Sequence, residues 1–210
     1  MASSDYVTIT IEGVGGHGAL PHRTADPVVA ACSIVMALQT VVARNVDPIS
    51  SAVVTVGAVN AGKANNVIPQ NATLLLGVRA GDPATREILQ RRITALVHAQ
   101  AEGYGVRATI DYQVGYPVLV NSAAETDFAR QVAAELVGSE QIVHQGAAQT
   151  SSEDFAYMLE QVPGSYLWIG NGAGDSAGAC MVHNPGYDFN DAILPLGAAY
   201  WVLMARRFLA

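Results

Sequence analysis

The order of strand-like and helix-like segments in the first 115 residues constrains the fold more than any other feature of this sequence. The strand-like segments alternate apolar and polar residues, as Val7, Ile9 and Ile11 do with their polar neighbours. In chain order we expect strand 6–12, helix 26–44, strand 51–59, strand 72–79, helix 83–102 and strand 106–114. This β-α-β-β-α-β order is typical of a ferredoxin-like sandwich, in which antiparallel strands carry two helices on one face.

The second half of the chain has a different character. Tyr116 and Pro117 end the alternating pattern. After them we expect helix 124–137, helix 153–161, strand 166–169 and helix 194–208, with a Gly-, Asn- and Asp-rich loop over 170–191. These segments contain too few strands to form a sheet of their own. Residues 116–210 are therefore interpreted as part of a larger α/β layer, so the whole chain belongs to the α/β class with an α+β first domain.

Composition excludes several classes of partner. The formal net charge is −7 and only 11 residues are basic, with no basic cluster, so we expect no nucleic-acid partner. The longest apolar run, 28–43, is short for a bilayer span and contains polar residues, so we expect no membrane partner. The first residues resemble no export signal, and Cys32 and Cys180 are far apart and form no disulfide framework. We therefore expect a reducing, cytoplasmic location.

Two loops contain histidines among glycines or prolines. The segment 13–18 fits the G-x-G-x-x-G pattern after a strand, but Pro21 follows it and the next strand ends without an acidic residue, which disfavours a dinucleotide site. The same glycines can instead hold His17 at the tip of a loop. His183 lies in a second such loop, close to Asp188 and Asp191, as a metal ligand with a neighbouring carboxylate would. Taken alone, the position of His17 is more typical of an ordinary solvated surface residue, and the position of His183 fits a surface residue as well as a ligand.

Several short segments in a fixed order resemble the M20 family of metallopeptidases and amidohydrolases. The similarity is greatest to its aminoacylase, hippurate hydrolase and auxin-conjugate hydrolase branch. Each segment is weak evidence alone, but the ordered set covers almost the whole chain. The segments are Gly15-Gly16-His17-Gly18-Ala19-Leu20-Pro21-His22, Asp26-Pro27, Ala64-Asn65-Asn66-Val67-Ile68-Pro69, Gly77-Val78-Arg79, Ser152-Glu153-Asp154-Phe155, Pro163-Gly164, His183-Asn184-Pro185, Asp188-Phe189-Asn190-Asp191 and Leu194-Pro195-Leu196-Gly197.

The resemblance implies a domain organisation and an assembly. Residues 5–115 resemble the ferredoxin-like lid that also dimerises, so a homodimer through the lid is expected. Residues 116–210 resemble the C-terminal segment of the catalytic α/β domain, and the N-terminal catalytic half of that domain has no counterpart here. That half supplies most ligands of a centre of two divalent ions (Zn, Mn, Ni or Co) and the glutamate general base in the family.

The resemblance also implies roles for four residues. His183 matches the terminal metal ligand, and it is the single residue of this sequence that matches a metal ligand of the family. His17 matches the lid histidine that polarises the scissile carbonyl in the partner subunit's site. Asn66 and Arg79 match positions that bind the substrate's carboxylate or the tetrahedral intermediate. The implied reaction is hydrolysis of the amide bond of N-acyl amino acids such as hippurate, or of small peptides. The alternative is a catalytically inactive dimerisation and lid module.

Overall fold

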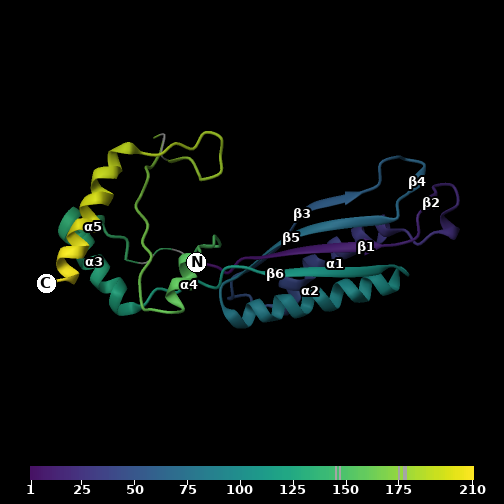
Figure 1. The fold of residues 1–210 in the computed structure, drawn as a ribbon, viewed down its shortest axis with the longest axis horizontal. Helices are drawn as coiled ribbons and strands as arrows, with labels where there is room; N and C mark the ends of the chain where they lie inside the picture. The colour runs from purple at the N-terminus through teal and green to yellow at the C-terminus, as the bar shows by residue number, and fades with distance from the viewer. Residues whose placement is uncertain (145, 147, 175, 177–178) are drawn as a thin grey trace. The chain divides into compact units, whose positions relative to one another are not determined.

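A computed structural model describes residues 1–144, 146, 148–174, 176 and 179–210. The chain forms two compact units, the first comprising Met1–Val120 and Ala147–Tyr157, the second Asn121–Gly146 and Met158–Ala210. The sheet of the first unit contains the antiparallel strands β1 (Asp5–Glu12), β3 (Ala52–Ala61), β5 (Asn71–Ala80) and β6 (Arg107–Val114) in the order β3-β5-β1-β6. Helices α1 (Pro27–Asn45) and α2 (Pro83–Gly103) cover one face of it (Figure 1). The expected ferredoxin-like sandwich, and with it the mixed α/β class, is confirmed.

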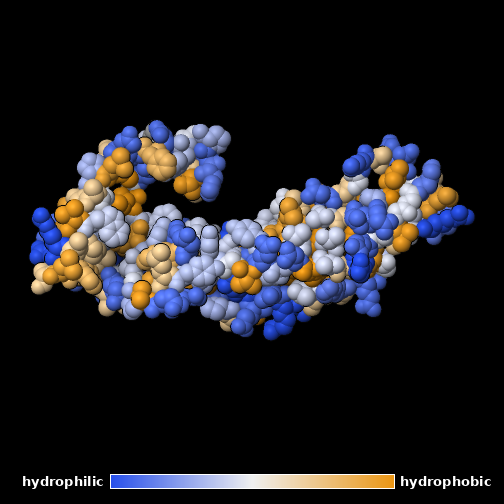
Figure 2. Space-filling model, in the orientation of Figure 1, coloured by the Kyte–Doolittle hydropathy of each residue, from blue (hydrophilic) through white to orange (hydrophobic). Residues whose placement is uncertain are grey.

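Alternate residues along each strand point to opposite faces of the sheet, which gives the sheet one buried and one more exposed face. In β1, Val7, Ile9 and Ile11 are buried against the helices, and the residues between them are half-buried or exposed on the other face. Strand β5 buries alternate residues in the same way, so the hydrophobic core lies between the sheet and the two helices. Polar and weakly polar residues cover much of this unit in the view of Figure 2, with apolar side chains scattered between them.

Helix α1 begins where the sequence predicts. The Asp26 carboxylate accepts the backbone N–H of Val28 at 2.8 Å, and Pro27 occupies the first turn. Helix α1 is apolar nearly all round, but it is not buried all round: Ile34 and Leu38 are fully buried, whereas Met36 is 70% exposed. The helix is long and apolar enough to cross a bilayer by length and composition alone, a test that the core helices of globular domains also pass.

The second unit contains helices and loops in its described residues. It includes α3 (Ala123–Val137), the short 3-10 helices Ser139–Gln141 and Asp191–Ile193, and α5 (Leu194–Phe208). Helix α4 (Phe155–Leu159), shorter than the expected helix 153–161, begins in the first unit and ends in the second. The expected strand over 166–169 is wrong, because this segment has no strand partner among the described residues. Helix α5 buries none of its residues, and apolar residues lie exposed along it (Figure 2).

Candidate functional site

His17 and Asn66 lie together at one end of the first unit. The two-residue strands β2 (Gly16–His17) and β4 (Val67–Ile68) pair there, beyond the end of the main sheet (Figure 1). His17 pairs with Val67, and the backbone N–H of Gly18 donates to the backbone oxygen of Asn66 at 2.8 Å, so the exposed residues His17 and Asn66 lie on neighbouring chain segments. We call this β2–β4 pair the lid tip, after the lid that the family resemblance implies for residues 5–115.

The glycines of the 13–18 segment serve this local packing. A Cβ at Gly13 would lie 2.1 Å from the backbone oxygen of Ala25, and one at Gly18 would lie 3.1 Å from the backbone of Asn66. A larger residue at either position would push the neighbouring chain away. The pattern that superficially resembles a dinucleotide fingerprint thus allows the close approach of chains that holds His17 in place.

The hydrogen bonds of His17 determine what its ring can do. Its Nδ1 accepts the backbone N–H of Ala19 at 3.0 Å. A ring nitrogen that accepts carries no proton, so in the neutral imidazole the proton is assigned to Nε2. His17 therefore presents an N–H donor to its surroundings from an exposed position, as stabilisation of a developing oxyanion requires.

Arg79 lies at the opposite end of the sheet from the lid tip. Strand β5 starts at Asn71, next to β4, and Arg79 is eight positions further along it, which corresponds to about 26 Å of extended chain. The structure therefore brings His17 and Asn66 together but holds Arg79 far from both within one chain.

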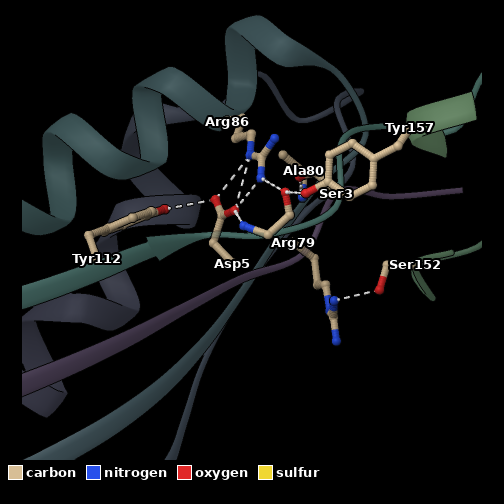
Figure 3. A network of polar contacts seen from close by, with 9 residues as sticks. Ser3, Asp5, Arg79, Ala80, Arg86, Tyr112, Ser152 and Tyr157 are labelled. Carbon is tan, nitrogen blue, oxygen red and sulfur yellow. Dashed lines mark hydrogen bonds and ion pairs between the residues drawn. The ribbon is translucent and has the colours of Figure 1, made fainter. Parts of the chain in front are cut away.

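Arg79 has hydroxyl-bearing neighbours in the structure. Its neighbours Val78 and Ala80 are buried against the helices, so the half-buried Arg79 lies on the other face of the sheet. Its Nη1 donates to Ser152 Oγ at 2.9 Å (Figure 3). The pKa of the Tyr6 phenol is lowered by the Ser4 hydroxyl and then by the nearby Arg79 guanidinium. No carboxylate pairs with Arg79 among the residues that the structure describes, so the guanidinium retains donors for an anion.

A second arginine at this end of the sheet is neutralised. Arg86, in the first turn of α2, donates from Nε to both carboxylate oxygens of Asp5 at 3.1 Å and forms an ion pair with it through Nη2. The fully buried Asp5 also accepts from Tyr112 Oη and from the backbone N–H of Gly115, both at 3.1 Å (Figure 3). Because Asp5 is the first residue of β1 and Gly115 follows β6, the network fixes the point where the chain enters and leaves the sheet.

The environment of Tyr112 predicts a pH dependence of stability. Burial, and then the Asp5 carboxylate, raise the pKa of Tyr112 above its ordinary value of 10.0. Below about pH 10 the tyrosine is protonated in both the folded and the unfolded chain, so its contribution to stability is complete. Above about pH 10 the unfolded chain loses this proton first, so the free energy of unfolding falls. We expect Tyr112→Phe to flatten this fall in urea unfolding curves recorded from about pH 8 to 11. The exposed Tyr104→Phe is the control, and equal slopes in both variants would contradict the prediction.

His183 lies in the second unit, in the loop that precedes α5. It has a φ of 68°, in the left-handed region that residues with a side chain seldom adopt. The backbone N–H of Gly186 donates to Asn184 Oδ1 at 2.8 Å, which closes a local turn beside it. No group of three or more His, Cys, Asp or Glu side chains that could hold a metal occurs among the described residues. These residues therefore do not form a two-metal centre by themselves, and His183 remains a single candidate ligand.

Comparisons with known proteins agree with this fold and these segments. The sequence profile of peptidase family M20/M25/M40 matches residues 8–207, so the chain belongs to this family of hydrolases. The hippurate hydrolase of Campylobacter jejuni is 38% identical over 209 residues, which are 100% of this chain and 53% of that protein. An IAA-amino acid hydrolase of Arabidopsis thaliana is 34% identical in an alignment of 213 positions that covers 100% of this chain and 48% of that protein.

A solved structure also matches. It belongs to a dinuclear metal-binding peptidase of the M20 family from Bacillus subtilis, with a TM-score of 0.73 and 27% identity over 98% of this chain and 49% of that chain. The chain thus spans about half the length of the relatives it matches.

Proposed function

We propose that this chain is the lid and C-terminal segment of a metal-dependent amidohydrolase that cleaves N-acyl amino acids, with small peptides as further substrates. The observation that carries the proposal is the half-buried Arg79, whose guanidinium contacts hydroxyl groups and no acid in the described structure. A guanidinium with free donors binds a carboxylate through two parallel hydrogen bonds. The free carboxylate of an N-acyl amino acid is such a ligand, and the names of the relatives agree with this substrate class.

The positions of His17 and Arg79 support a site shared between two subunits. An N-acyl amino acid is far shorter than the roughly 26 Å of strand that separates Arg79 from the lid tip. One chain therefore cannot place both residues on one substrate molecule. In a homodimer formed through the lids, the lid tip of one subunit would supply His17 and Asn66 to the carbonyl end of a substrate whose carboxylate is bound by Arg79 of the other.

The metal ions belong to the complete enzyme. Two divalent ions, Zn, Mn, Ni or Co, would polarise the scissile amide and activate water there. Within this chain His183 is the candidate ligand, and the other ligands would come from outside the described residues. We propose a cytoplasmic location, in agreement with cysteines that are both free in the structure.

The absence of a cluster of metal ligands in the described residues favours a second candidate function, a dimerisation and lid module without catalysis. Metal content tests whether this chain holds a metal centre by itself. After extensive dialysis, two tightly held divalent ions per chain would identify a complete hydrolase, whereas no bound metal would identify a lid with a remnant of the catalytic domain.

Carboxylate recognition is tested by calorimetric titration of the chain with hippurate and with its neutral amide, N-benzoylglycinamide. We expect hippurate to bind at least 10-fold more tightly, because hydrogen bonds between charged groups contribute about 1.5–3 kcal/mol. Arg79→Ala should remove this difference. Arg92→Ala, at an exposed position of α2, is the control. Equal affinity for both ligands in the unmodified chain would contradict the proposed carboxylate site.

A further inference from the structure

The segment 148–157 lies far along the sequence from the sheet but packs against its entry and exit point. The backbone N–H of Ala2 donates to the backbone oxygens of Gln149 and Ser151, both at 3.0 Å. Tyr157 Oη donates to the backbone oxygen of Gly115 at 3.2 Å, and its ring makes an edge contact with Tyr116 at 6.0 Å between centroids. The segment is thus fixed at both of its ends, and Ser152 lies between them.

Two arginines near this segment have different partners. Arg86 lies on the helix-covered side of the sheet, where Asp5 neutralises it, and its Nη2 donates to the same Gly115 oxygen that Tyr157 contacts, at 2.9 Å. Arg79 lies on the other side, where the hydroxyl of Ser152 accepts one of its N–H groups. The Asp5–Arg86 pair therefore fixes Gly115 by hydrogen bonds, and the Gly115 oxygen accepts from Tyr157. Tyr157 ends the segment that carries Ser152 to Arg79 (Figure 3).

We propose that Ser152 is a positioning residue for carboxylate recognition: it fixes the Arg79 guanidinium before the substrate binds, and the Asp5–Arg86–Gly115–Tyr157 contacts keep it in place. This proposal rests on the proposed role of Arg79. A free arginine side chain loses rotamer freedom when it binds a ligand, and a side chain that is already fixed loses less. A guanidinium has five N–H donors, so the bond to Ser152 leaves enough of them to hold both oxygens of a carboxylate.

The test measures hippurate affinity and the mobility of the Arg79 side chain in the 210-residue chain. We expect Ser152→Ala to weaken hippurate binding about 2–10-fold, the effect of ordering one long side chain. In the ligand-free protein, relaxation of the Arg79 Nε–Hε group should show faster motion in Ser152→Ala than in the unmodified chain. Ser152→Thr keeps the hydroxyl and should restore both properties, and Tyr157→Phe should reproduce part of the loss.

Two controls make the result decisive. Ser151→Ala changes the neighbouring exposed serine and should leave binding and mobility unchanged, and thermal unfolding of each variant shows that the fold is retained. If Arg79→Ala weakens hippurate binding but Ser152→Ala does not, the positioning role of Ser152 is wrong and the proposed function stands. If Arg79→Ala has no effect either, the carboxylate site itself is wrong and the role of Ser152 falls with it.

Discussion

Asp5→Ala is expected to lower the free energy of unfolding by about 3–5 kcal/mol, the cost of removing one partner of a buried ion pair. Asp5 is 1% exposed and accepts from Arg86, from Tyr112 Oη and from the backbone of Gly115. The substitution removes all of these acceptors at once. The Arg86 charge then remains partly buried without a counter-ion, and two further donors have no acceptor.

The matched control is the exposed pair of Arg107 and Glu12, whose side chains are 75% and 38% exposed. Solvent and salt screen this pair, so Glu12→Ala should cost less than about 1 kcal/mol. Urea unfolding at neutral pH measures both variants, and the difference should persist at high salt because Asp5 is out of solvent. A loss for Asp5→Ala no larger than that for Glu12→Ala would show that the network stabilises the fold little.

The sheet and its two helices could be predicted because local patterns specify them. Each strand alternates residues with a period of two, and Asp26-Pro27 specifies the start of α1. The same alternation predicts the burial of Asp5: it lies two residues before Val7, in phase with Ile9 and Ile11, so it points to the buried face of β1. A buried carboxylate at that position requires a buried partner. That the partner is Arg86 could not be predicted, because 81 positions separate the two residues.

Other features could not be predicted because they depend on distant neighbours. The apolar segment 166–169 has the composition of a strand, but without a partner strand among the described residues it forms no ladder. One face of α1 is solvent-exposed, and this could not be predicted because the helix is apolar on that face too. The packing of 148–157 against the sheet rests on a few backbone and tyrosine contacts, which leave no periodic pattern in the sequence.

The candidate site shows the same limit. The glycines around His17 indicated a loop tip, and the β2–β4 pairing places Asn66 beside it. The order of motifs along the chain also grouped Arg79 with His17 and Asn66 as substrate-contacting residues. Strand β5 begins near the lid tip and ends at the other end of the sheet, where Arg79 lies. The direction of β5 therefore separates Arg79 from His17 and Asn66 within one subunit, and the sequence motifs do not show this separation.

His17→Ala is expected to lower kcat by roughly 10²–10³ in a catalytically competent form of the enzyme, the usual cost of removing one oxyanion donor. Because His17 presents its Nε2–H from the lid tip and Arg79 binds the carboxylate elsewhere, KM should change much less. His22→Ala, five positions further on in the same loop, is the matched control and should retain most of the activity. Unchanged kcat in His17→Ala would exclude the oxyanion role.

Mixing two inactive variants tests whether His17 acts on the partner subunit. In a dimer of one His17→Ala and one Arg79→Ala chain, the first chain keeps its own Arg79 and receives His17 from the second, so one of the two sites is intact. If subunits exchange at random, about half of the dimers are mixed and about a quarter of all sites should regain activity. Recovery near this fraction requires that the two residues serve one substrate from different subunits. No recovery after verified subunit exchange would show that at least one of these residues has another role, because one chain cannot place both on one substrate molecule.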